Sequence, residues 1–284
     1  MKFICKSLKI SFGIITIIFT FMSGTFFECI QWITPQTLEK HNYLSRFNIT
    51  DINSFFSRIL CFMIVLCITM LFYKLFLHCR TRIKIKGENY IISVEYGDIL
   101  KKENCKKVIN FDECFTTEVG TSTASINATS ICGQYLSLHK DIDIEELIEL
   151  NEIKPDCDKS KYRNKTKYPS GTIIPYEDDL LMAFAKLDEK GKGRFFNRDE
   201  YIQCLDLLWK ELENYYSEKD VCVPILGAGT TSFDGGYGSS ISQQDLLDMM
   251  IWSYKLSSHK IKSPNKLRII CKRNPDFSIN DIDV

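Results

Sequence analysis

The chain has 284 residues, of which 45% are hydrophobic, and it carries 36 basic and 36 acidic residues. This length allows one soluble domain of about 200 residues with additional elements. The zero net charge hides an asymmetry, because residues 1–86 hold 11 Lys and Arg against 3 Asp and Glu, whereas residues 87–284 hold 25 against 33. The acidic part argues against a nucleic-acid partner, and the basic part is also the most apolar, which indicates a membrane.

The first part of the chain predicts two membrane-spanning helices. One uncharged run extends from Ile10 to Phe27, and a second apolar run follows Arg58. Since a helix of about 20 apolar residues crosses a bilayer, we expect spans at about residues 10–30 and 59–78. The alternative is a cleaved signal peptide followed by a single anchor, but no small-x-small cleavage site follows the first run.

Basic residues flank the predicted hairpin on both outer sides. Three lysines precede the first span and four Lys or Arg residues follow the second, whereas the connecting loop holds its basic residues far apart. The positive-inside rule therefore predicts that both termini lie in the cytoplasm. We expect residues 1–80 to form a two-span hairpin in the cell inner membrane and residues 81–284 to form a cytoplasmic ligand-binding domain.

The 12 cysteines form no C-x-x-C pair, and with four histidines in the chain no metal-ligand spacing occurs. Several cysteines lie in apolar runs, which favours buried or membrane-embedded thiols in a reducing compartment. We therefore expect neither a metal ion nor a cofactor.

The second part of the chain alternates strand and helix patterns. Strands are predicted at 91–94, 108–111, 180–187, 221–226 and 267–271, and helices at the start of 122–138, around 144–148, at 197–214 and at 243–256. Gly133 is expected near the end of the first of these helices, and Asn197 is expected to cap the helix at 197–214. Such alternation predicts an α/β domain with right-handed crossovers and a largely parallel, covered sheet, whose ligands bind at the carboxyl ends of the strands.

A glycine-rich stretch connects the predicted strand 221–226 to the predicted helix 243–256. The loop contains Gly227 and Gly229, and Ser242 with Asp245 marks the start of the helix. Unpaired backbone N–H groups beside a helix N-terminus attract phosphate, although glycine turns after strands also occur without a ligand. No lysine follows these glycines and the loop comes late in the chain, so it is neither a P-loop nor a Rossmann fingerprint.

Three motifs occur in a characteristic order: Gly97-Asp98-Ile99 after the first strand, Asn110-Phe-Asp-Glu-Cys-Phe115 after the second, and the glycine loop before a late helix. In this order they resemble a macro domain, a three-layer α/β/α fold with a mixed, mostly parallel sheet that binds ADP-ribose. Together with the two predicted spans, the chain resembles the membrane-anchored macro-domain effectors of type II Thoeris anti-phage defence systems.

The resemblance implies a role for each motif. Asp98, which is otherwise an ordinary turn aspartate, would accept a hydrogen bond from the adenine amino group beside the backbone of Ile99, and Asn110 would line the distal ribose. Glu113, Phe115 and Thr117 would form the rim of the first loop. The residues implied to hold the diphosphate and distal ribose are Leu226, Gly227, Ala228, Gly229, Thr230, Thr231, Ser232 and Phe233. Phe277 would either stack on adenine or belong to the core.

The resemblance implies a receptor-effector that is not an enzyme. Its signal would be an ADP-ribose derivative such as histidine-ADP-ribose, made by a partner TIR-domain protein. Binding would cause homo-oligomerisation and disruption of membrane lipids, ending in abortive infection. One alternative is a membrane-tethered ADP-ribosyl or ADP-ribose-ester hydrolase. Hydrolytic macro domains, however, carry a glycine run where this chain has Asp112, Glu113, Cys114 and Phe115, and no catalytic Ser/His/Asp or Cys/His arrangement occurs. A hairpin-anchored interaction protein is the third reading.

Overall fold

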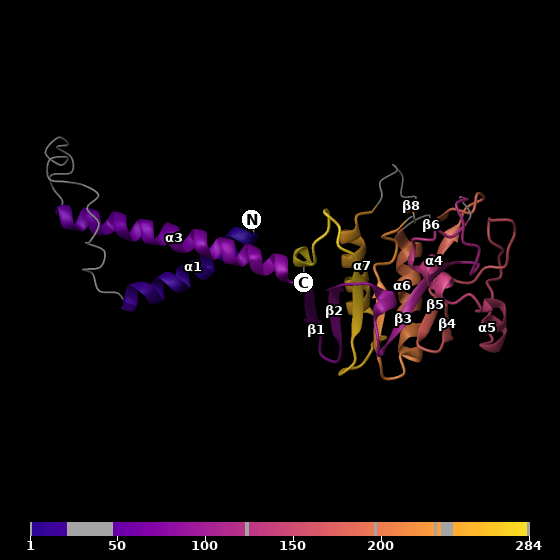
Figure 1. Ribbon diagram of the computed structural model, residues 1–284. Coiled ribbons are helices and arrows are strands. Elements are labelled where there is room, and N and C mark those ends of the chain that lie inside the picture. The colour runs from indigo at the N-terminus through magenta and orange to yellow at the C-terminus, as the bar shows by residue number, and fades with distance from the viewer. Residues whose placement is uncertain are drawn as a thin grey trace. The chain divides into compact units, whose positions relative to one another are not determined.

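The structure is a computed structural model that describes residues 2–21, 48–122, 125–195, 198–229, 232–233 and 241–282. The chain divides into two compact units, Met1–Arg80 and Thr81–Val284 (Figure 1). The described residues of the first unit are helical, whereas those of the second form a sheet and several helices.

The first unit contains two long helices, α1 (Lys2–Phe21) and α3 (Ile49–Cys79). They contact each other, with the rings of Phe12 and Phe62 6.1 Å apart between centroids. Within the described residues, one helix, α3, is long and apolar enough to cross a membrane, and the mean hydropathy of an 18-residue window in it is 2.5. The predicted second span lies inside α3.

The predicted first span coincides in part with α1, whose apolar portion is Ser7–Phe21. The rest of that prediction, residues 22–30, lies outside the described residues. In α1 and α3 the hydroxyl groups of Ser11, Thr16, Thr20 and Thr69 each donate to the carbonyl oxygen four residues earlier. These polar side chains are thus satisfied within their own helix, as an apolar environment requires.

The second unit is built on a nine-stranded sheet with the order β1-β2-β9-β7-β3-β5-β6-β8, and β4 also pairs with β5. The strands are β1 (Arg82–Lys86), β2 (Ile91–Tyr96), β3 (Cys105–Asp112), β4 (Ile173–Tyr176), β5 (Asp179–Leu187), β6 (Gly193–Phe195), β7 (Asp220–Pro224), β8 (Ser232–Phe233) and β9 (Leu267–Cys271). β2, β9, β7, β3 and β5 run parallel. β1 pairs antiparallel with β2, β4 and β6 pair antiparallel with β5, and β8 pairs parallel with β6. The expected mixed, mostly parallel sheet is confirmed.

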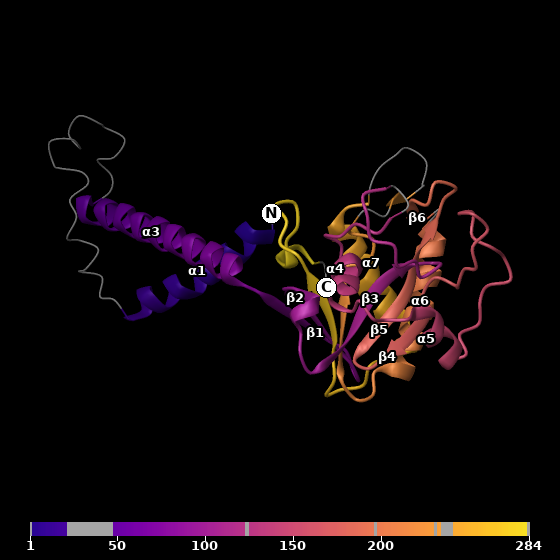
Figure 2. The same cartoon turned by 45° about the vertical axis from the view of Figure 1, so that its right-hand side comes forward.

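Helices cover both faces of this sheet (Figures 1 and 2). They are the short 3-10 helices η2 (Ile99–Lys101) and η3 (Ile279–Asp281), and the α-helices α4 (Ile131–Leu138), α5 (Ile144–Leu150), α6 (Arg198–Tyr215) and α7 (Gln243–Leu256). α6 and α7 pack on one face, and α4 and α5 pack on the other. The result is the expected three-layer α/β/α arrangement.

The central strand β5 shows how the sequence produces these layers. Leu180 and Met182 belong to the hydrophobic core under α6 and α7, whereas Leu181 and Ala183 belong to the core under α4 and α5. All four are fully buried. Because successive side chains of a strand point to opposite faces, a continuous apolar run is what a strand covered on both faces requires.

The helix predictions on the α6/α7 side are confirmed. Helix α7 begins and ends as predicted, and the backbone N–H of Asp245 donates to Ser242 Oγ over 3.1 Å. In α6 the predicted apolar stripe (Tyr201, Leu205, Leu208 and Leu212) is fully buried. The predicted cap Asn197 lies outside the described residues.

The helix expected to begin within residues 122–138 starts later than predicted, at Ile131. Ser130 caps it by accepting a hydrogen bond from Gly133 N, so Gly133 lies in the first turn and not near the end. A Cβ atom at Gly133 would lie 2.2 Å from the carbonyl oxygen of Asn127. The glycine marks a close approach of two backbone segments, which local helix patterns do not reveal.

Candidate functional site

The carboxyl ends of the five parallel strands lie at one edge of the sheet, and the predicted site residues follow three of them. Asp98 follows β2, Glu113 follows β3, and Leu226 follows β7. Because β9 lies between β2 and β7, and β3 lies beside β7, the three segments leave the edge in the order β2, β7, β3. The structure therefore brings the three predicted motifs to the same edge.

Asp98 caps the short helix η2, and its Oδ1 accepts a hydrogen bond from Leu100 N over 3.1 Å. This contact fixes the carboxyl group at the edge of the sheet. Ile99 is buried against Cys105, Cys222 and Ile270, so it anchors the turn from beneath.

Asn110 lines a cavity of about 340 Å³ at the end of β3. Asn127 and Ser130 enter it from the segment before α4, and Lys192 from the turn after β5. The sequence analysis missed these three polar residues. A signal was present for two of them, because Asn127 Oδ1 accepts from Thr129 N and Ser130 caps α4, both typical of an Asn-x-x-Ser segment before a helix.

The loop after β3 is held in shape by Asp112. Its carboxylate accepts hydrogen bonds from Cys114 N over 2.8 Å, from Thr116 N over 3.2 Å and from the Thr116 hydroxyl group. Burial raises the pKa of Asp112, and the three hydrogen bonds act in the opposite direction.

Glu113 and Phe115, two of the predicted rim residues, are 3% and 4% exposed. The Glu113 carboxylate accepts from Ser160 Oγ over 2.5 Å and from Leu187 N over 3.1 Å. The Phe115 ring lies 5.5 Å from that of Tyr168, centroid to centroid. Both side chains are thus part of the interior that supports the loop.

Thr117 is exposed and lines a second hollow, of about 870 Å³, between the loop after β3 and α5. Of the three predicted rim residues, it is the one whose side chain reaches solvent.

The glycine loop starts at Leu226, whose backbone N–H and carbonyl oxygen are both hydrogen-bonded to side chains. Its N–H donates to Met250 Sδ over 3.4 Å, and its carbonyl oxygen accepts from the Tyr201 hydroxyl group over 3.0 Å. Gly227 follows with a φ of 83°, a conformation that favours glycine. Ala228 and Gly229 are exposed, and the space where Gly229 would carry a Cβ is open.

The remaining predicted loop residues are only partly described. Thr230 and Thr231 lie outside the described residues. Ser232 and Phe233 form β8, which pairs with β6. Phe277, for which two roles were open, is 6% exposed and packs edge-on against Tyr96, so it is a core aromatic residue.

Cys132 and His139 are poorly placed to act as a nucleophile or a base at this edge. Cys132 lines the cavity at Asn110, but burial raises the pKa of its thiol well above the usual range. The His139 ring stacks on Tyr135, and its Nε2 lies 4.0 Å from Oδ2 of Asp179. Because Asp179 is the first residue of β5, His139 lies at the opposite, amino edge of the sheet. In the described ranges, no three His, Cys, Asp or Glu side chains are grouped so that they could hold a metal ion.

In α/β domains with a mostly parallel sheet, ligands bind among the loops at the carboxyl edge, which is where the predicted motifs of this chain lie. The family model described as "Thoeris protein ThsA, Macro domain" matches residues 92–272, which is more than half of the chain. The chain therefore belongs to the ThsA macro-domain family.

A relative named Thoeris protein ThsA, from Bacillus amyloliquefaciens (strain Y2), is 28% identical over 200 residues. The match covers 66% of this chain and 65% of the relative, so slightly less than two thirds of that protein is represented.

Solved macrodomains are among the structures that match this chain. A mutant of the Oceanobacillus iheyensis macrodomain matches with a TM-score of 0.43 and 10% identity, covering 69% of this chain and 91% of its own. Another mutant of it, with ADPR, gives 0.38 and 12%, covering 68% and 91%. Thermosipho africanus DarTG in complex with ADP-ribose gives 0.36 and 14%, covering 68% of this chain and 45% of its own.

Proposed function

We propose that this chain is a membrane-anchored anti-phage defence effector whose macro domain binds an ADP-ribose-derived signal. The observation that carries this proposal is the order of the three motifs along the carboxyl edge. Asp98 follows β2, the glycine loop follows β7, and Asn110 lies at the end of β3. Adenine, diphosphate and distal ribose follow one another in ADP-ribose in the same order.

The spacing of the strands supports this arrangement. Neighbouring strands lie about 4.8 Å apart, so the three steps from β2 to β3 span roughly 14 Å. The adenine group would lie at Asp98, the diphosphate at the exposed backbone of Ala228 and Gly229, and the distal ribose in the cavity at Asn110. A backbone surface without a covering side chain is what close approach to a diphosphate requires.

The buried state of Glu113 and Phe115 sharpens their proposed role. Their side chains support the loop after β3, and that loop presents its backbone and Thr117 to the ligand. Glu113 therefore acts as a positioning residue, and Phe115 supports the loop at the hollow that it lines together with Thr117.

In the proposed mechanism a TIR-domain protein supplies the signal, for instance histidine-ADP-ribose. Both termini lie in the cytoplasm and the N-terminal hairpin lies in the inner membrane. Ligand binding promotes self-association, which clusters the hairpins, disrupts membrane lipids and ends in abortive infection. A ligand can drive this step only if it binds the assembled state more tightly than the resting state.

The proposal is tested by calorimetric titration of the full chain in detergent with ADP-ribose. We expect binding that falls at least about 10-fold in Asp98→Ala, because a hydrogen bond to a charged group contributes roughly 1.5–3 kcal/mol. Unchanged affinity in this variant would refute the site assignment. Liposomes that contain the chain and a trapped dye test the membrane step, and binding without dye release would refute that step alone.

A receptor is also distinguished from a hydrolase by turnover. Incubation of the full chain with an ADP-ribosylated protein is expected to release no ADP-ribose above the rate without the chain. Release that disappears in Asn110→Ala would establish the hydrolase in its place.

A further inference from the structure

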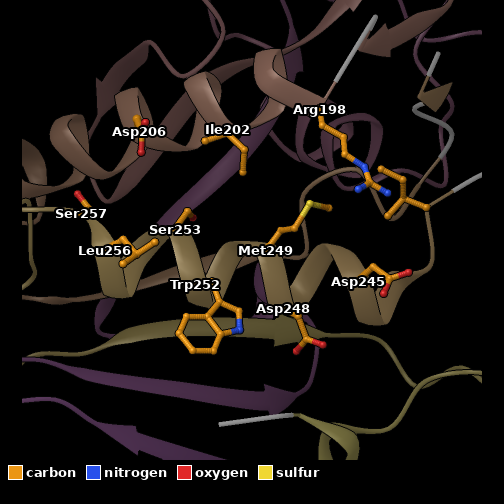
Figure 3. A pocket seen from close by; sticks show the side chains of 11 residues that line it. Arg198, Ile202, Asp206, Asp245, Asp248, Met249, Trp252, Ser253, Leu256 and Ser257 are labelled. Atoms are coloured by element: carbon orange, nitrogen blue, oxygen red, sulfur yellow. The ribbon is translucent and has the colours of Figure 1, made fainter. Parts of the chain in front are cut away.

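The cavity at Asn110 differs in charge from two other hollows of the same domain. The groove between α6 and α7 is lined by three carboxylates and one guanidinium group, those of Asp206, Asp245, Asp248 and Arg198 (Figure 3). The hollow between the loop after β3 and α5 also has more acidic than basic residues in its lining. The cavity at Asn110 is lined by one acidic and one basic residue, Asp112 and Lys192. An anion therefore meets less repulsion in this cavity than in the other two hollows.

The carboxylate of Asp112 is already occupied by its own loop. Its Oδ1 accepts hydrogen bonds from Cys114 N and Thr116 N, and its Oδ2 accepts one from the Thr116 hydroxyl group. Both oxygens thus have partners other than Lys192, so the positive charge of that lysine remains available to the cavity.

Lys192 differs in this respect from the other cations of its hairpin. Lys186 is paired with Glu200 over 2.7 Å, and Arg194 is paired with Asp188 over 2.5 Å. Among the described residues, the ammonium group of Lys192 has no hydrogen bond or ion pair. A cation that lines a cavity without a partner of its own is suited to bind an anionic group of a ligand.

The turn that carries Lys192 is fixed by Asp188. The Asp188 carboxylate accepts from Lys190 N over 2.9 Å and from Lys192 N over 2.8 Å, and Asp188 N donates to the carbonyl oxygen of Lys192 over 3.1 Å. The backbone of Lys192 is therefore held in place before a ligand binds, which lowers the entropy lost on binding.

Asn127 supplies a second hydrogen-bond donor to the same cavity. Its Oδ1 accepts from Thr129 N over 2.9 Å and from Thr129 Oγ1 over 2.8 Å. Because this oxygen is occupied, the amide nitrogen is the group of Asn127 that is left for a ligand, and it can only donate. An ammonium group and an amide donor in one cavity match an ionised carboxylate, which can only accept.

Lys192 lies one strand beyond the proposed position of the distal ribose. In the sheet order β7-β3-β5, the turn after β5 follows the end of β3 on the side away from β7. One strand step is about 4.8 Å, which a substituent on the ribose can span. The cavity volume of about 340 Å³ falls within the range of roughly 300–1,000 Å³ for sites that hold whole small molecules, so a ribose ring leaves room for such a substituent.

We propose that Lys192 is a specificity-determining residue that selects ligands with a carboxylate beyond the distal ribose, and that Asn127 donates to the same carboxylate. The ligand class is then ADP-ribose joined through its distal ribose to a small carboxylic acid, such as an amino acid. This inference rests on the proposed function and deepens it by naming the chemical group that is recognised at the far end of the ligand.

The first test compares ligands by calorimetric titration of the full chain in detergent. The ligands are ADP-ribose, histidine-ADP-ribose and histamine-ADP-ribose, which lacks only the carboxylate of the second. We expect histidine-ADP-ribose to bind about 10-fold more tightly than histamine-ADP-ribose. Equal affinities for these two, with ADP-ribose still bound, would overturn this inference alone. A chain that binds none of the three would refute the proposed function and this inference with it.

The second test changes the cation. Lys192→Met is expected to weaken the binding of histidine-ADP-ribose about 10-fold and that of ADP-ribose less than about 2-fold. Lys192→Arg, which keeps the charge, should stay within about 3-fold of the unmodified chain for both ligands. The matched control is Lys190→Met, since Lys190 is exposed in the same turn but outside the cavity, and it should change either affinity less than about 2-fold. An equal loss for both ligands in Lys192→Met would mean that Lys192 contacts the diphosphate, and would refute the inference.

Discussion

Two loops leave the same edge of the sheet and are built in opposite ways. In the loop after β3, Asp112 and Glu113 together accept hydrogen bonds from five donors, and Phe115 is buried. In the loop after β7, Leu226 is held by α6 and α7, but Ala228 and Gly229 are exposed. The first loop is fixed by side-chain contacts, whereas the second exposes its backbone. This difference separates residues whose side chains fix a loop from residues whose backbone is exposed to solvent.

The largest expected effect comes from removing side-chain contacts in the loop after β3. Glu113→Ala removes a buried carboxylate and leaves Ser160 Oγ and Leu187 N without their acceptor. We expect a loss of about 3 kcal/mol in the free energy of unfolding, measured by thermal or denaturant unfolding of the full chain in detergent. Glu118→Ala is the control, because Glu118 is exposed, and it should change stability by less than about 0.5 kcal/mol. Similar losses in both would show that Glu113 does not hold the loop.

A change in the loop after β7 should have the opposite pattern of effects, on ligand affinity and not on stability. Gly229→Glu places a carboxylate where the space is open, so we expect unchanged stability but a loss of ADP-ribose affinity of about 30-fold, or 2 kcal/mol. The cause is repulsion of the diphosphate and loss of the approach to the backbone. Gly229→Ala, which adds only a methyl group, should retain the affinity within about 3-fold. Calorimetry of the full chain checks both, and equal affinity of the two variants would place the diphosphate elsewhere.

A second glycine, Gly133, tests the segment before α4, which lines the cavity at Asn110. Gly133→Ala brings a Cβ to 2.2 Å from the carbonyl oxygen of Asn127. Although alanine normally stabilises a helix relative to glycine, we expect a loss of about 2 kcal/mol here, because two backbone segments must separate. Leu138→Ala, at a position 70% exposed on the same helix, should cost less than about 0.5 kcal/mol. A gain in stability for Gly133→Ala would show that the approach is looser than described.

The smallest effect concerns the charge of Asp112, whose pKa is raised by burial above the ordinary 3.8. A group with a raised pKa in the folded state contributes stability at low pH that is lost as the pH rises through that pKa. Asp112→Asn removes this titration. We therefore expect the stability of the variant, relative to the unmodified chain, to increase as the pH rises from below 3.8 towards neutral. Urea unfolding at several pH values measures it, and a decrease would mean that the hydrogen bonds outweigh burial.

The fold was predictable where local patterns are strong. Helix α7 and strand β9 have the predicted bounds, because a capping serine and a run of apolar residues define them without help from distant residues. Strand β1 was missed, since Arg82, Lys84 and Lys86 were read only as the basic flank of a membrane span. In the structure they alternate with Ile83 and Ile85, which face the core, and charged residues on an edge strand are a common protection against edge-to-edge pairing.

The position of the candidate residues at one edge of the sheet was predictable, but the burial of their side chains was not. The parallel order of strands brings Asp98, Asn110 and Leu226 to one edge, as the alternation of strands and helices indicated. The burial of Glu113 was not predictable, because its partner Ser160 lies 47 residues further along the chain, in a loop that no pattern connects to β3. Lys192 was missed for the same reason, since only the folded sheet brings the turn after β5 to the cavity.

The connection between the two units is unusually short. Only Arg80 and Thr81 separate the end of α3 from the start of β1, a reach of about 10 Å at most. Strand β1 is itself fastened by Arg82, whose guanidinium contacts Glu95 over 2.5 Å, and Glu95, 2% exposed, is also paired with Arg268 of β9. Burial raises the pKa of Glu95, but the hydrogen bonds from Arg268 and Arg82 and the charge of Arg268 outweigh it. The pKa of the carboxyl group therefore lies below its ordinary value. Arg82 of β1 and Arg268 of β9 thus converge on Glu95 of β2, so that one buried carboxylate joins three neighbouring strands at the edge where the domain begins.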